Sequence, residues 1–223
     1  MAHKAYQGPA DALTELVGYL GGTTRVTALH QTLVQGSVDV RTSHSVDAVA
    51  YARFSPTDGF VRPTPVMYVV STLERETTNG MWFVLDVPQG ATIISASLTL
   101  YQSEVFEWHG ALDSFVIRAE QTDHAAHWID HADALARHAN TGTTKLVDDI
   151  VGAPAIGDPE IITLPVAMIQ EIVSRAGWAS GNQVCLMAYN ETNLKEATHQ
   201  MYGRDGVSEA LQPRLQVEFE YLA

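Results

Sequence analysis

The sequence contains a single cysteine, Cys185, so no disulfide can form within the chain. Cys185 lies in the apolar run 183–189, without a neighbouring histidine or an electropositive setting, and we predict a buried core residue rather than a nucleophile. The amino terminus lacks the apolar segment of a secretory signal, and no stretch reaches the roughly 20 apolar residues of a spanning helix. We therefore expect a protein that stays in the cytoplasm of the cell that makes it.

Basic residues are also few, 13 against 26 acidic residues, and the formal net charge is -13. No run of Lys and Arg occurs, and an acidic surface repels phosphate backbones and anionic lipids, so we expect neither nucleic acid nor membranes as partners. Glycine-rich phosphate loops and the Gly-x-Ser-x-Gly elbow are absent. No carboxylate pair stands out among the acids, and we expect no enzymatic activity.

What the sequence does contain is a series of strand patterns. They alternate apolar and polar residues, are rich in Val, Thr and Ala, and are separated by Pro and Gly turns. Asn79 and Gly80 are interpreted as one such turn. We predict strands over residues 25–33, 37–43, 47–54, 66–71, 81–87, 91–101, 114–120, 160–163, 182–189, 199–203 and 213–222.

Two of these strands show a period of two residues. In residues 91–101, one face is largely apolar and is formed by Ile94, Ala96, Leu98 and Leu100. In residues 213–222, Leu215, Val217, Phe219 and Tyr221 alternate with polar residues. Many strands without a βαβ rhythm predict an all-β, antiparallel jelly-roll sandwich with two or three short helical inserts. At 223 residues the chain suits one such domain.

Three segments have helical patterns. Residues 9–20 carry an apolar stripe of Leu13, Leu16, Val17 and Leu20, and Gly21-Gly22 follows it. We interpret residues 1–24 as a helical arm and residues 25–223 as the sandwich; the arm packs on its own domain or docks on a neighbouring subunit. The other two helices are predicted over residues 130–138, with Ala132, Leu135 and Ala136 inward, and over residues 164–175, with Ile169, Ile172 and Val173 inward.

Three motifs in order resemble the jelly-roll family of DNRLRE-type domains and related carbohydrate-binding modules of bacterial surface and phage proteins. The first motif, residues 87–98, is a Pro-x-Gly-Ala turn followed by a strand. The second, residues 166–184, is a helix followed by Gly-Trp, by Ser-Gly-Asn and by a strand. The third, residues 213–219, is a closing strand that begins with Pro-Arg. The resemblance implies a structural, adhesive or sugar-binding module without catalysis. The sequence departs from that family in a long histidine-rich insert, and it lacks the DNRLRE string.

The histidine-rich insert is the strongest candidate for a metal site. On a helix, His124, His127 and His131 would share one face, and neutral imidazoles suit Zn, Ni or Cu. The spacing is not a standard zinc signature, and a solvated polar loop is the favoured interpretation. Asp148-Asp149 and Asp158-Pro159-Glu160 are candidates for calcium, but they lack the dense acidic loop of an EF-hand, and solvated turns are favoured. We expect no obligatory cofactor.

Aromatic residues outside the predicted strands suggest a sugar platform, since sugars stack on aromatic faces. Phe106, Trp108 and Trp128 are its candidates, although such residues more often fill the cores of loops. Two functions remain from the sequence. The favoured one is a non-enzymatic structural protein of a phage particle, a capsid decoration or minor tail component, assembled in the host cytoplasm and bound to other subunits or to itself. The alternative is a carbohydrate-binding or adhesion module of a bacterial surface protein.

Overall fold

The computed structural model of the chain describes the backbone of residues 17–19, 25–27, 33–41, 46–52, 55–64, 66–71, 75–103, 115–147, 155–189, 197–204 and 207–222. Side chains are described for residues 33–41, 78–103, 115–130, 132–147, 155–189, 200–204 and 207–222. Everything below refers to these parts of the chain.

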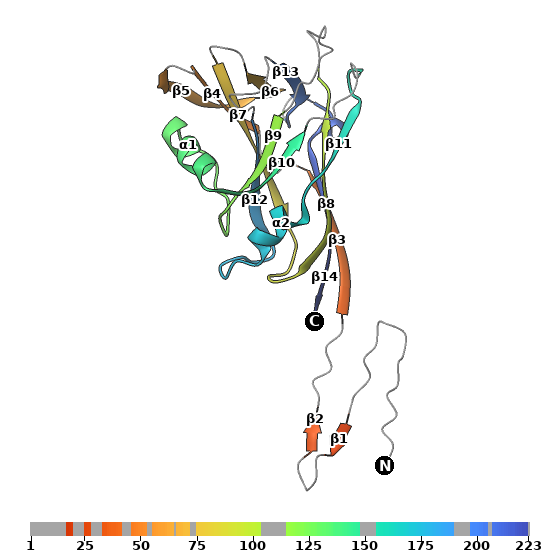
Figure 1. Cartoon of the computed structure of the whole chain (residues 1–223). Helices are drawn as coiled ribbons and strands as arrows, with labels where there is room; N and C mark the ends of the chain where they lie inside the picture. The colour runs from red at the N-terminus through yellow and green to blue at the C-terminus, as the bar shows by residue number, and fades with distance from the viewer. Residues whose placement is uncertain are drawn as a thin grey trace.

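Two antiparallel sheets form a sandwich (Figure 1). The four-stranded sheet has the order β11 (Pro159–Thr163), β8 (Thr92–Tyr101), β14 (Arg214–Leu222) and β3 (Leu33–Arg41). The larger sheet begins with β10 (Thr141–Val147), β9 (Phe115–Glu120), β12 (Asn182–Tyr189) and β7 (Arg75–Leu85). It continues past β7 with β4 (Val46–Ala52) and β5 (Ser55–Thr64), and β6 (Val66–Ser71) joins β7 to β13 (Ala197–Tyr202).

The strand order is that of a jelly roll. If β3, β7, β8, β9, β10, β11, β12 and β14 are numbered along the chain from 1 to 8, one sheet has the order 6-3-8-1 and the other begins 5-4-7-2. Apart from β9 and β10, which pair with each other, successive strands of this set cross between the sheets in two interlocked Greek keys, which define this fold. The predicted all-β jelly-roll sandwich is confirmed. Strands β4, β5, β6 and β13 are insertions that widen the larger sheet.

The main core lies between the two sheets. Large side chains such as Phe83, Leu98 and Phe115 are fully buried there, and burial of each contributes roughly 1.5–3 kcal/mol. Helix α2 (Val166–Val173) closes one end with the predicted residues Ile169, Ile172 and Val173, all buried. Trp178 follows it, 3% exposed, and its Nε1 donates to the Val87 carbonyl at 2.9 Å. Cys185 is fully buried, as predicted.

The predicted turn at Asn79 and Gly80 is wrong, because both residues lie inside β7. The Asn79 side chain is buried, and its Nδ2 donates to the Ala188 carbonyl of the neighbouring strand at 3.4 Å. At Gly80, a Cβ atom would lie 2.6 Å from the ring of Trp82 and 2.9 Å from that of Trp128. Glycine is present here for close packing of two indoles, not for a turn.

The predicted inward face of β8 is wrong at its first residues. Ile93 is buried, and Ile94 is 47% exposed. A β-bulge causes the change: Ser95 pairs with Glu218 and Ile93 pairs with Phe219, which leaves Ile94 without a partner on β14. One extra residue reverses the alternation on one side of the bulge only.

Helix α1 (His131–Ala139) matches the predicted helix in position but not in its buried face. Asp130 is its N-cap and accepts a hydrogen bond from the Asp133 amide. Ala134 is buried, whereas Ala132 and Ala136 are exposed. Residues 141–147 form β10, which is not among the strands predicted from the sequence.

The predicted helix over residues 9–20 is wrong at its end, where Val17 begins a strand. β1 (Val17–Tyr19) pairs with β2 (Arg25–Thr27) in a two-stranded sheet of its own. A glycine inside β1 and a Gly-Gly step between the strands weaken a helix and favour a hairpin. Leu13, Leu16 and Leu20 lie outside the described residues.

We predict that Gly80→Ala lowers the free energy of unfolding by about 1–3 kcal/mol, because the new methyl group collides with two rigid indole rings. Urea denaturation monitored by tryptophan fluorescence measures the loss. In a Trp128→Phe background, where one ring is smaller, the same substitution should destabilise the protein less. Equal losses in both backgrounds would contradict the packing assigned to Gly80.

Candidate functional site

A second buried cluster lies on the outer face of the larger sheet. Trp82 of β7 and Cys185 and Met187 of β12 point away from the main core. They are covered by part of the histidine-rich insert, which contributes Ala125, Trp128 and Ala134. We call residues 121–140, the irregular segment 121–130 with α1 and Asn140, the cover (Figure 1). The cover adds a third layer to the sandwich at this place.

The two tryptophans fix the geometry of this layer. The rings of Trp82 and Trp128 lie edge to face, with centroids 5.3 Å apart, and His127 stacks on Trp82 at 4.5 Å. The Trp82 Nε1 donates to the Ala126 carbonyl at 3.0 Å. Trp128 is only 5% exposed, so its predicted role in a sugar platform is wrong. Phe106 and Trp108, the other two candidates, lie outside the described residues.

An ion cluster lies beside the tryptophans, between β9 and α1. The Glu120 side chain is buried, and its Oε1 lies 3.7 Å from Nη1 of Arg137. Arg137 also donates from Nε to Asp133 Oδ1 at 2.8 Å and from Nη1 to the Ala126 carbonyl at 2.7 Å. Burial raises the pKa of Glu120, and the nearby Arg137 partly opposes this effect. Because the carboxyl is covered, we interpret the cluster as an anchor for α1, not as an acid or base for a substrate.

Two further polar side chains of this layer, Arg118 and His138, contact Tyr189. The Arg118 guanidinium lies 5.1 Å from the centre of the Tyr189 ring, and the His138 ring meets it edge to face at 4.4 Å. A cation over an aromatic face contributes about 0.5–1 kcal/mol at exposed sites and more where it is desolvated. His138 thus helps to hold α1 on this face of the sheet, and Arg118 connects the neighbouring strands β9 and β12 there.

The structure does not place the predicted metal ligands on one helix. His124 and His127 lie in the irregular segment before α1, and His131 is the first residue of α1, with a side chain outside the described set. The exposed His124 accepts a hydrogen bond at Nδ1 from the Gln183 amide at 3.1 Å, whereas His127 stacks on Trp82. The described residues contain no group of three His, Cys, Asp or Glu side chains placed to hold a metal ion.

The calcium candidates have a similar outcome. Asp158 accepts a hydrogen bond from the Ala155 amide at 2.8 Å and follows the turn at residues 156 and 157. Asp148 and Asp149 lie outside the described residues.

Polar contacts attach the first residues of the cover to α2 and to the chain that follows it. Glu171 of α2 accepts hydrogen bonds from Gln121 Nε2 at 3.1 Å and from the Thr143 amide of β10 at 3.0 Å. Asp123 accepts a hydrogen bond from Arg175 Nε at 2.6 Å, and Asn182 Nδ2 donates to the Asp123 carbonyl at 2.9 Å. The last residue of the cover is tied to the first, because the Gln121 amide donates to the Asn140 carbonyl at 3.0 Å.

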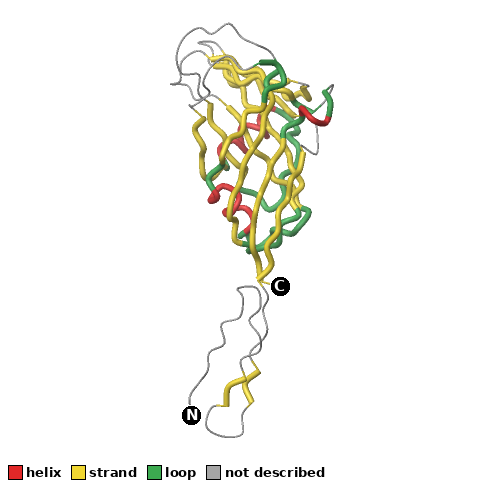
Figure 2. Tube along the Cα trace, turned by 90° about the vertical axis from the view of Figure 1, so that its right-hand side faces the viewer, coloured by secondary structure: helices red, strands yellow, loops and turns green. Residues whose placement is uncertain are grey.

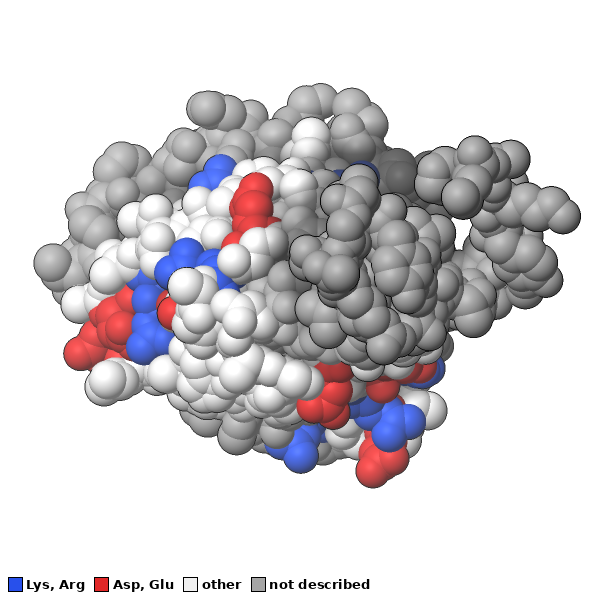
Figure 3. Space-filling view, turned by 90° about the horizontal axis from the view of Figure 1, so that it is seen from below, with Lys and Arg blue, Asp and Glu red and all other residues white. Residues whose placement is uncertain are grey.

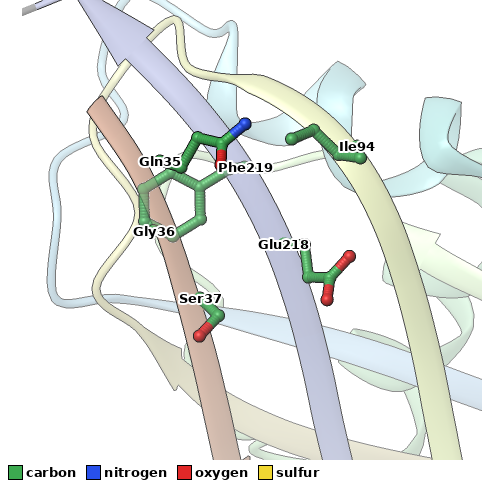
Figure 4. A pocket seen from close by; sticks show the side chains of 6 residues that line it. All are labelled: Gln35, Gly36, Ser37, Ile94, Glu218 and Phe219. Atoms are coloured by element: carbon green, nitrogen blue, oxygen red, sulfur yellow. The ribbon is translucent and has the colours of Figure 1, made fainter. Parts of the chain in front are cut away.

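A shallow hollow lies on the four-stranded sheet, at the bulge in β8 (Figure 4). Its volume is about 420 Å³, and its lining residues are Gln35, Gly36, Ser37, Ile94, Glu218 and Phe219. The Phe219 ring occupies the space beside Gly36, where a Cβ atom would lie 2.6 Å away. The hollow carries one carboxylate and one exposed isoleucine and suits surface contact better than enclosure of a small ligand.

The part of the described surface that Figure 3 shows carries charges of both signs. In the view from below, acidic and basic side chains are interspersed, with uncharged surface between them (Figure 3). None of the described helices is long and apolar enough to cross a membrane.

Comparison with known proteins adds little. No protein-family model and no curated protein matches the sequence. A solved structure titled Desmodium yellow mottle tymovirus matches over 93% of this chain and 94% of that chain, with 9% sequence identity and a TM-score of 0.27. A likeness this weak supports no statement about function, and the jelly-roll assignment rests on the strand order. The resemblance to DNRLRE-type domains stays a prediction.

We predict that replacing Glu120 by Gln changes stability in a pH-dependent way. Because its pKa is raised in the folded chain, Glu120 contributes most favourably below its ordinary value of 4.5, and this contribution is lost as the pH rises through the folded pKa. The free energy of unfolding of Glu120→Gln, relative to wild type, should therefore increase from pH 4.5 toward neutral pH. Urea denaturation at several pH values tests this, with the exposed Glu218→Gln as control; a difference independent of pH would contradict it.

We also predict that Arg137→Met destabilises the protein by about 2 kcal/mol, because it leaves the Glu120 carboxylate buried without its cation. Adding Glu120→Gln removes that uncompensated charge, so the double variant should be more stable than Arg137→Met alone. A double-mutant cycle measures the coupling. Additive effects of the two substitutions would show that the two side chains do not interact.

Proposed function

We propose that the protein is a non-enzymatic structural component of a bacteriophage particle, a capsid decoration or minor tail protein. It is assembled in the host cytoplasm and contacts other subunits through its outer surface and N-terminal arm. The observation that carries the proposal is the position of β1 and β2: they precede β3, an edge strand of the jelly roll, and neither of these two strands pairs with a described strand of the sandwich.

The hairpin β1–β2 supports the role of the arm. Among the described strands, β1 and β2 pair only with each other. In two views at right angles, the hairpin lies beyond the end of the sandwich (Figure 1) (Figure 2). A hairpin that adds no strand to the sheets of its own domain is available to a neighbouring subunit, which could bury the apolar side chains of the hairpin.

The packing of the sandwich supports a scaffold role. The larger sheet is buried on both faces where the cover lies, and the ionised groups of that layer bind one another or the backbone. Such a layer makes the outer surface rigid. A rigid surface is what a repeated subunit contact needs, since less conformational entropy is lost on association.

The alternative, a carbohydrate-binding or adhesion module, has lost one of its three aromatic candidates, because Trp128 is buried. No described feature favours it over the structural role.

We predict that peptides of this chain occur in density-gradient-purified particles from the source culture, at a fixed ratio to the major capsid protein. A variant without residues 1–24, which removes β1 and leaves β2 without its partner, should keep the circular dichroism of the sandwich and be missing from particles. A chain that stays wholly in the soluble fraction would contradict the proposal. Binding on a glycan array that Trp108→Ala abolishes would establish the adhesion function instead.

A further inference from the structure

The two sheets have open edges, and most of them carry features that discourage pairing with another chain. β11 has five residues and begins with Pro159. β10 has a register irregularity against β9 and carries Lys145. β5 contains Pro56 and Pro63. Short length, proline, lysine and irregular register each prevent an edge strand from recruiting a further strand.

β3 has none of these features. It has nine residues, contains neither proline nor lysine, and pairs with β14 in a continuous register over its whole length. No other described strand pairs with its outer edge. In Figure 4, β3 lies beside β14, and β8 lies on the other side of β14. A long, regular, unprotected edge presents a row of backbone donors and acceptors to another strand.

The side chains of β3 also remain incompletely covered on the core side. Val34, Val38 and Val40 are only half-buried, although Val38 and Val40 pack against the main core. On the outer side, Leu33 is 43% exposed. A strand added at this edge would cover these apolar side chains, which lie at the margin of the sandwich.

We propose that β3 pairs with β3 of a second copy of this chain, antiparallel and around a two-fold axis at Ser37. Ser37 is the midpoint of the strand, so this register pairs all nine residues. The two four-stranded sheets then form one continuous sheet across the dimer. Such a contact is isologous, with the same surface on both subunits.

The side chains of β3 complement themselves in this register. Asp39 lies opposite Gln35 of the second copy, Arg41 opposite Leu33, Val34 opposite Val40 and Gly36 opposite Val38. No like charges are opposed, whereas an axis at Asp39 would bring two carboxylates together. Asp39 and Arg41 are already held by Arg214 and Glu209, so neither charge enters the seam without a partner.

The inference does not depend on the particle function, because it concerns two copies of the isolated chain. Ser37→Lys places two ammonium groups opposite each other at the axis, whereas within one chain it faces Glu218 of β14 and leaves the fold intact. Gln216→Lys is the matched control, exposed on β14, an interior strand with both edges paired. Analytical ultracentrifugation of the full chain should show a wild-type dimer whose dissociation constant rises at least about tenfold in Ser37→Lys and little in Gln216→Lys.

Two further measurements make the test specific. Mixing Ser37→Lys with Ser37→Glu should restore dimers, since opposite charges then meet at the axis. A wild-type chain that is monomeric at every concentration would overturn the inference. So would an oligomer that Ser37→Lys leaves unchanged, or one that is lost on deletion of residues 1–24 but not in Ser37→Lys, because the contact would then lie elsewhere.

Discussion

The fold depends on the central strands of the larger sheet being apolar on both faces. In β12, six consecutive residues, Val184 to Tyr189, are buried, and in β7 Trp82 points away from the main core while its neighbours point into it. A jelly roll needs only one apolar face on each sheet, so the second face must be covered by something else. The cover meets this requirement: its tryptophan and alanines bury the outer face of the sheet, and its ion cluster anchors α1 there.

This constraint explains why a polar, histidine-rich segment is part of the hydrophobic architecture. Within the cover, only Ala125, Trp128 and Ala134 enter the buried cluster, and the half-buried imidazole of His127 stacks on the indole of Trp82. The burial of the Glu120 carboxyl is compensated by Arg137, which faces it and is itself held by hydrogen bonds to Asp133 and to the Ala126 carbonyl. Composition alone suggested a solvated loop or a metal site, since a few apolar residues at irregular spacing give no periodic signal.

The parts of the fold that the sequence predicted are those with strong local periodicity. β14 and α2 follow their expected faces, because alternation or a 3.6-residue period decides which side chains are buried. The predictions are wrong where a contact with a residue far away in the sequence decides the local conformation. Asn79 and Gly80 were predicted to form a turn because the neighbouring residues do not reveal the contacts with Trp128 and the Ala188 carbonyl. Ile94 was predicted to point inward because the sequence around it does not reveal the β-bulge. The continuous apolar run of β12 was the one available signal that a third layer exists.

The same bulge links the interior of the small sheet to its outer surface. It turns Ile93 into the core and Ile94 out beside the hollow. On the other side of β14, the continuous pairing with β3 places Phe219 opposite Gly36, whose missing side chain gives the ring its space. Since Phe219 fills the position that a larger residue would take on β3, the edge strand stays regular and closely paired to β14. A regular edge strand is able to accept another strand. The packing of Phe219 against Gly36 inside the sandwich therefore determines whether β3 can pair with a further strand.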